Sequence, residues 1–158
     1  MEKKWTFLHM KINDDLNKKI LNILLEDSKL SYRNIAKKAG ISGVTALKRI
    51  KELKKAHIIK NYTIELDYEK MGYDINVIIM MKIERGIISQ IDKKISGDPN
   101  VYAIYDVTGQ FDCIIMARFK NRKDLDLFIK KILTYDFVER TETILTLNII
   151  KEKNINVH

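Results

Sequence analysis

The sequence predicts an α+β protein in which a helical N-terminal domain precedes a domain with the element order βαββαβ. Two observations carry this prediction. Residues 14–55 contain three segments whose apolar residues recur at helical spacing, and residues 73–150 alternate between strand-like and helix-like segments. A length of 158 residues suffices for two small domains. We therefore divide the chain into a first domain at 1–66, a connector at 67–72, a second domain at 73–150 and a polar tail at 151–158.

Three helices are expected in the first domain. The first helix spans Asp14–Glu26, and its inward face carries Leu16, Ile20, Ile23 and Leu24. Two shorter helices follow within residues 31–55, where Ser31 and Ser42 are suitable N-caps. Gly40 lies between them and can adopt the left-handed conformation that ends a helix. This is the pattern of a helix-turn-helix, whose second helix normally enters the major groove of DNA.

The second helix of this motif, residues 43–55, has a basic outer face. Ala46, Ile50 and Leu53 share the inner face, and the opposite face carries Val44, Lys48, Lys51 and Lys55. Residues 29–55 hold nine basic residues and one acid, and residues 1–72 carry a net charge of +7 against +1 for residues 73–158. An ordinary solvated face would mix both signs, so the concentration of positive charge favours nucleic acid binding.

The predicted DNA contacts divide into two kinds. Val44, Thr45 and Lys48 lie near the start of the helix, where side chains reach base edges. The basic side chains expected to contact mainly phosphates are Arg33, Lys37, Arg49, Lys51 and Lys55. Arg49 also points partly toward the core, so a structural role is the alternative for it. Ser42 and Gly43, which begin the helix, complete the predicted DNA-binding set.

A wing is predicted to follow the motif. Tyr62–Leu66 alternates like a strand, and this favours a winged helix-turn-helix. His57 and Asn61 stand where a positive φ would help the chain turn, and both residue types tolerate it better than most.

The second domain is predicted to be ferredoxin-like, with two helices on one face of an antiparallel sheet. Gly109-Gln110 is expected to form a two-residue hairpin turn between the second and third strands. The expected strands are Tyr73–Glu84, Val101–Thr108, Phe111–Phe119 and Val138–Ile150, and the expected helices are Ile87–Ile95 and Arg122–Leu133.

The predicted sheet has more apolar surface than one buried face requires. Residues 77–81 and 113–117 are apolar at consecutive positions, whereas a sheet with one open face should alternate with polar residues. We expect a second copy of the chain to cover the open face, which would also give the paired helix-turn-helix motifs two-fold symmetry. The alternative is cover by loops or by residues 5–8 of the N-terminal lead.

Several other classes of protein are disfavoured by the composition. No apolar run approaches the length of a membrane span, and the N-terminus lacks the pattern of a signal peptide. A single cysteine, Cys113, suits the cytoplasm and is expected to be a small core residue. The three histidines are scattered, and there is no C-x-x-C, H-E-x-x-H or glycine-rich phosphate loop. We therefore expect that the protein is not an enzyme and that it has no metal site and no cofactor.

The order of motifs closely resembles the Lrp/AsnC (feast/famine) transcriptional regulators. The segments AKKAGISGVTALKRIKELKKAHIIKNYT and VYAIYDVTGQFDCIIMARF carry the resemblance, which covers about residues 12–150. It implies a sequence-specific regulator of prokaryotic type, archaeal members included, with a ferredoxin-like RAM-type domain. It also implies dimers that assemble into tetramers or octamers, contacts with the transcription machinery, and an amino-acid effector. The alternative function is an architectural, chromatin-like protein that coats DNA with little sequence specificity.

The resemblance points to the hairpin at Gly109-Gln110 as the effector site. Its candidate residues are Thr108, Gly109, Gln110, Phe111 and Asp112. The Asp112 carboxylate would accept from an α-amino group, and backbone N–H groups near Gly109 would hold a carboxylate. The alternative is structural, with Gly109 needed only for the turn and Asp112 bonded to the hairpin backbone.

Overall fold

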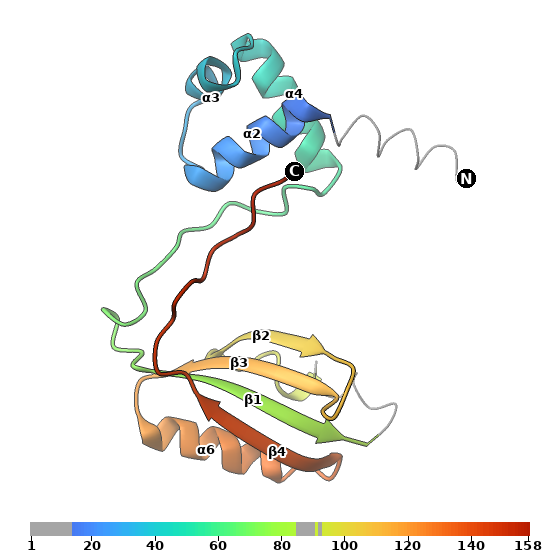
Figure 1. Ribbon diagram of the computed structural model, residues 1–158, viewed down its shortest axis with the longest axis vertical. Helices are drawn as coiled ribbons and strands as arrows, with labels where there is room; N and C mark the ends of the chain where they lie inside the picture. The colour runs from blue at the N-terminus through green and yellow to red at the C-terminus, as the bar shows by residue number, and fades with distance from the viewer. Residues whose placement is uncertain (1–13, 85–90, 92) are drawn as a thin grey trace, which may run out of the picture. The chain divides into compact units, whose positions relative to one another are not determined.

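The computed structural model describes residues 14–84, 91 and 93–158, and the chain forms two compact units (Figure 1). One unit contains Met1–Glu65 together with Glu152–His158, and the other contains Leu66–Lys151. The last residues of the chain, assigned above to a separate polar tail, therefore group with the helical unit. The N-terminal segment at residues 5–8 lies outside the described residues. Among the described residues, no helix has the length and apolar character needed to cross a membrane.

The helical unit contains α2 (Asp15–Glu26), α3 (Tyr32–Ala39) and α4 (Gly43–Lys55). Each helix begins where a polar side chain accepts a hydrogen bond from the third residue along, at Asp14, Ser31 and Ser42. Gly40 ends α3 with φ 76°, as predicted. The core residues shared by the three helices are Ile20, Ile23, Leu24, Ile35, Ala36, Ala39, Ala46, Ile50 and Leu53.

The predicted wing strand at Tyr62–Leu66 is wrong. Residues 61–66 are exposed and form no strand. A wing strand needs a pairing partner, and the chain passes instead into a turn at residues 68–72. Tyr62 is held by another contact, since the Lys54 ammonium lies 4.6 Å from the centre of its ring. His57 has the expected positive φ of 57°, but Asn61 does not share it.

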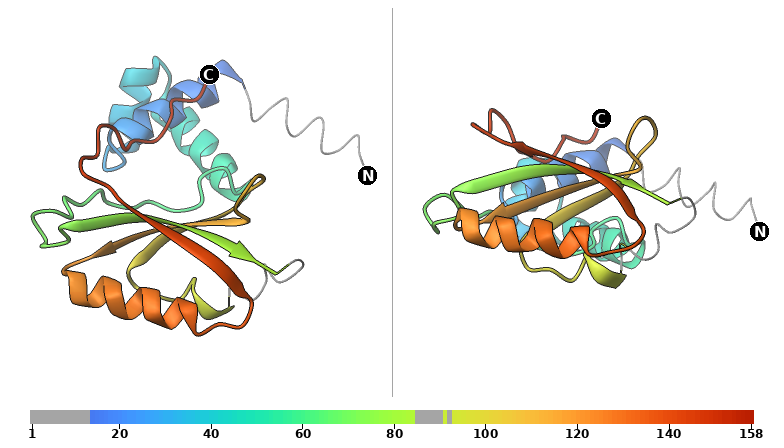
Figure 2. Two further views of the ribbon diagram at one scale, coloured as in Figure 1. Left: turned by 60° about the horizontal axis from the view of Figure 1, so that its bottom comes forward. Right: turned by 90° about the horizontal axis from the view of Figure 1, so that it is seen from below.

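The second unit is a four-stranded antiparallel sheet in the order β2-β3-β1-β4. The strands are β1 (Ile75–Ile83), β2 (Val101–Asp106), β3 (Cys113–Phe119) and β4 (Val138–Leu145). Helix α6 (Arg122–Leu133) covers one face of the sheet (Figure 2). The predicted helix at residues 87–95 lies partly outside the described residues, and residues 91, 93 and 94 of it are helical.

The two faces of the sheet differ in burial. Val77, Ile79 and Met81 pair with Ala117, Ile115 and Cys113, and all six are fully buried in the core that includes Phe128 and Ile132 of α6. The alternate residues of the central strands lie on the opposite, open face and are half-buried. They are Ile78, Met80, Ile114 and Met116.

Two boundaries in the sheet differ from the prediction. β2 ends at Asp106 and β3 begins at Cys113, so a loop at residues 107–112 replaces the predicted two-residue turn. β4 ends at Leu145 and not at Ile150, because its partner β1 begins at Ile75. A last hydrogen bond from Thr146 N–H to the Asn76 carbonyl closes this edge, and the chain beyond it has no neighbouring strand to pair with.

Candidate functional site

The outward face of α4 carries most of the predicted DNA-binding residues in accessible positions. Val44 is 78% exposed in the first turn of the helix, although it is a β-branched apolar residue. Ser42 Oγ accepts from Thr45 N–H at 3.1 Å and lies 2.8 Å from Thr45 Oγ1, so the cap also orients the threonine hydroxyl. The other exposed members of the set are Arg33, Lys37, Ser42, Gly43, Lys48, Lys51 and Lys55.

The basic residues around the motif fall into two groups, those that contact another side chain of the protein and those that have no acidic partner among the described residues. Lys38 lies 3.8 Å from Glu26, Lys54 lies against Tyr62, and Arg49 is paired with Asp14. Within the part of the chain that the structure describes, no ion pair with an acidic side chain is found for Arg33, Lys37, Lys48, Lys51 or Lys55. These five cations are therefore available to neutralise an external polyanion.

Arg49 is the member of the predicted set that the fold uses elsewhere. Its Nη1 donates to Asp14 Oδ2, and both side chains are about one-third exposed. Asp14 Oδ1 simultaneously accepts from Asn17 N–H at 2.7 Å as the cap of α2. The arginine thus joins α4 to the beginning of α2, which supports the structural alternative for this residue.

The loop at residues 107–112 is attached to the end of β1 through Asp112. Asp112 Oδ1 accepts from Lys82 Nζ at 3.0 Å, and Oδ2 accepts from Ile83 N–H at 3.0 Å. Asp112 N–H also donates to the Met81 carbonyl at 3.0 Å. The carboxylate therefore bonds to the backbone of a neighbouring strand. This is close to the structural alternative, in which Asp112 bonds to the hairpin backbone. A ligand ammonium would have to compete with Lys82 for the carboxylate.

A hollow of about 650 Å³ lies beside this loop on the open face of the sheet. It has the size of a small-molecule site. Three of the five predicted effector residues line it, whereas Gly109 and Asp112 do not. Its lining residues are Met80, Asp106, Val107, Thr108, Gln110, Phe111 and Ile114. Sequence reasoning missed Asp106, which was assigned only to a strand, and Arg140, whose guanidinium lies 4.9 Å from the ring centre of Phe111.

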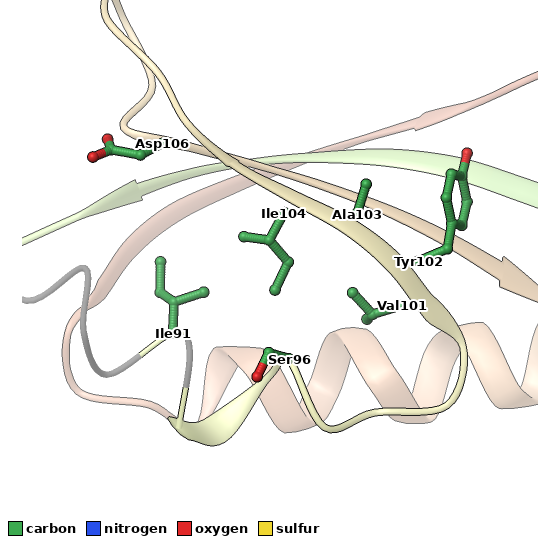
Figure 3. Close-up of a pocket in the computed structure, with 7 residues that line it drawn as sticks. All are labelled: Ile91, Ser96, Val101, Tyr102, Ala103, Ile104 and Asp106. Carbon is green, nitrogen blue, oxygen red and sulfur yellow. The ribbon is translucent and has the colours of Figure 1, made fainter. Parts of the chain in front are cut away.

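A second hollow, of about 390 Å³, is lined by residues of β2 and by Ile91 and Ser96 (Figure 3). Ile91 and Ile104 project into it from opposite sides, with Ser96 and Val101 nearby. Among the described residues that line it, Asp106 is the charged one. Its described lining also includes the polar side chains of Ser96 and Tyr102.

Cys113 does not have the properties of a nucleophile. The thiol is fully buried, and burial, followed by the charges of Asp106 and Asp112, raises its pKa to about 11. It is thus protonated at neutral pH. Among the described residues there is also no group of histidine, cysteine and acidic side chains that could hold a metal ion.

Comparison with known proteins gives two family matches. Residues 13–60 match the family of winged helix-turn-helix DNA-binding domains, and residues 76–155 match the Lrp/AsnC ligand binding domain. An HTH-type transcriptional regulator of Pyrococcus furiosus is 45% identical over 139 residues, which cover 88% of this chain and 94% of that protein.

Solved structures share the fold of the chain. The structure of E. coli AsnC has a TM-score of 0.83 and 26% identity, and the match covers 90% of this chain and 97% of that one. A transcriptional regulator of Neisseria meningitidis, crystallised with L-Met, has a TM-score of 0.83 and 23% identity over 89% of this chain and 93% of that one.

Proposed function

The chain belongs to the Lrp/AsnC family of DNA-binding transcriptional regulators, and we propose that it binds specific DNA sites as a homodimer or larger assembly whose affinity an amino acid adjusts. The observation that carries this proposal is the outward face of α4. It combines an exposed apolar residue, Val44, with Lys48, Lys51 and Lys55, which no acidic side chain of the described chain neutralises.

The two parts of this face have different roles. Val44 and Thr45 offer methyl groups suited to the methyl group of thymine, and Lys48 reaches acceptors on guanine. Lys51 and Lys55, with Arg33 and Lys37 on α3, neutralise phosphates and set the position of the helix. Arg49 is assigned to positioning α4 through Asp14 and not to a phosphate.

The open face of the sheet supports a homodimer. Ile78, Met80, Ile114 and Met116 lie together on it, and none of them is covered by α6. A second copy that packs its own sheet on this face would remove these side chains from water. A dimer of this kind would present two copies of α4 to a two-fold symmetric site.

The hollow beside residues 107–112 supports an amino-acid effector. Met80, Phe111 and Ile114 offer apolar contact to a ligand side chain, and the Asp106 carboxylate offers an acceptor to an α-amino group. Thr108 and Gln110 add polar groups at the rim. The family match to a ligand binding domain and the L-Met bound by the Neisseria regulator are consistent with this assignment.

The remaining parts of the proposal follow from the same role. A regulator of this kind works in the cytoplasm, contacts the transcription machinery and needs neither a catalytic site nor a cofactor. The Pyrococcus relative is named as an HTH-type transcriptional regulator.

Selection of DNA from a random pool at physiological salt tests the proposal. Recovery of a two-fold symmetric motif with half-sites about 10 base pairs apart, or a multiple of that spacing, is expected. The matched control is the double variant Val44→Ala/Lys48→Ala, which should retain salt-sensitive binding but recover no motif. Tight retention without any motif by the unaltered protein would contradict sequence-specific regulation and favour an architectural DNA-coating protein.

A further inference from the structure

The C-terminal segment of the chain is hydrogen-bonded to the helical unit through Val157. Val157 N–H donates to Asn22 Oδ1 at 2.8 Å, and Asn22 Nδ2 donates to the Val157 carbonyl at 3.0 Å. The two residues are separated by 135 positions in the sequence. Figures 1 and 2 both draw the C-terminus beside α2.

This pair of hydrogen bonds has the chemistry of backbone recognition. A carboxamide has one donor edge and one acceptor, as a peptide group does, so one asparagine can satisfy both backbone groups of a single residue in an extended segment. Val157 is the half-buried residue of the segment Glu152–His158, and its neighbours are exposed. Asn22 is also half-buried, on the flank of α2 beside its buried residues Ile20 and Ile23.

The contact gives the helical unit a second connection to the rest of the chain. The first connection runs from α4 through residues 56–74 to β1. The second runs from the end of β4 through residues 146–156 to the anchor at Val157. The second connection ends on α2, whereas the proposed DNA contacts lie on α3 and α4.

We propose that Glu152–His158 acts as a clasp, a segment of the chain that docks on α2 through Asn22 and Val157 and ties the DNA-binding unit to β4 by a second link. The surface around Asn22 is thus a binding site for an extended peptide backbone, and its occupant is the C-terminus of the same chain. Because two links allow less independent rotation than one, the clasp restricts motion of the DNA-binding unit relative to the sheet without occupying the DNA-binding face.

Amide hydrogen exchange of the full chain, followed by NMR, tests the docking. The Val157 amide should exchange about tenfold or more slowly than an unstructured amide, and Asn22→Ala should abolish this protection. The control Asn154→Ala makes the same change at an exposed residue of the segment and should preserve it. Unchanged protection of the α2 amides would show that Asn22→Ala still folds. An unprotected Val157 amide in the unaltered protein would overturn the proposal.

Mixed assemblies show whose tail occupies the site. Isotope-labelled chains with Asn22 intact are refolded with an excess of unlabelled Asn22→Ala chains. Retained protection of the labelled Val157 amide supports docking within one chain, and loss of protection would show that the tail docks on a second copy and would overturn the intrachain clasp. A chain that ends at Lys151 should in addition show faster local tumbling of the α2–α4 amides in NMR relaxation. Unchanged tumbling would overturn the restraining role.

Discussion

Arg49 on α4, the second helix of the helix-turn-helix, forms an ion pair with Asp14, the residue that caps α2. The two residues are 35 positions apart in the sequence. The same carboxylate accepts from Asn17 N–H with its other oxygen. The Asp14 side chain therefore provides an acceptor for a backbone N–H at the N-terminus of α2 and fixes α4 against α2. This arrangement directs a basic residue of α4 into the fold, so positive charge on the helix does not by itself identify a DNA contact.

Arg49→Ala is expected to destabilise the protein by about 1 kcal/mol, since it removes a partly exposed, charge-assisted hydrogen bond. Urea unfolding measures this change, and Lys51→Ala, an exposed substitution on the same helix, should leave stability nearly unchanged. If Arg49→Ala weakened DNA binding without affecting stability, the arginine would be a phosphate contact after all.

The two glycines of the helix-turn-helix should respond oppositely to alanine. Gly40 has φ 76°, and an added Cβ would meet no atom within 4 Å, so Gly40→Ala should cost about 1–2 kcal/mol from backbone conformation alone. Gly43 is helical with equally open surroundings, so Gly43→Ala should be neutral or stabilise by up to about 1 kcal/mol. Thermal unfolding compares them, and equal effects would argue against the left-handed turn.

Lys48 and Lys51 should differ in how their loss affects DNA binding. Lys48→Ala should cost about 1–3 kcal/mol on the selected site and little on unrelated DNA, because base contacts specify the sequence. Lys51→Ala should weaken binding to both and reduce the slope of log affinity against log salt by about one. Titration of labelled duplexes at several salt concentrations measures both quantities. A uniform loss for Lys48→Ala would show that this lysine contacts phosphate only.

Asp112 should matter for the stability of the sheet domain. Asp112→Ala leaves the Lys82 ammonium and the Ile83 N–H without this acceptor, at a cost of about 1–3 kcal/mol. Asp112→Asn keeps an oxygen that can accept from Ile83 and should cost less. Gln110→Ala in the same loop is exposed and serves as the control. Urea unfolding of the three variants tests this order, and a stable Asp112→Ala variant would contradict the structural role.

Cys113 should be unreactive in the folded protein. Burial raises the pKa of its thiol from 9.0 to about 11, so the folded state disfavours the thiolate. Because the pKa of the thiol is higher in the folded state, its contribution to the free energy of unfolding is fully present below the unfolded-state pKa. This contribution is lost as the pH rises from about 9 to about 11. Ellman's reagent at pH 8 should therefore react only after denaturant is added. Rapid reaction of the native protein would show that the strand is accessible.

The sequence predicted the helix-turn-helix nearly residue by residue because its signals are local. Ser31, Ser42 and Gly40 act on backbone groups three or four positions away, and the apolar residues of each helix follow its own period. Helix α6 was predicted with its observed boundaries for the same reason. The sheet was predicted less well at its ends, since a strand continues only as far as its neighbour, and the extent of β1 limits β4.

The sequence by itself determined the fold class, the order of the elements and the position of the basic helix α4, since periodicity, capping and charge act within short stretches of chain. Only the tertiary structure decided that Arg49 belongs to Asp14, that Asp112 bonds to Ile83 and that Val157 docks on Asn22. Each of these contacts joins residues far apart in the chain. Their partners are chosen by how the packed helices and strands bring distant groups together, and no local pattern encodes that choice.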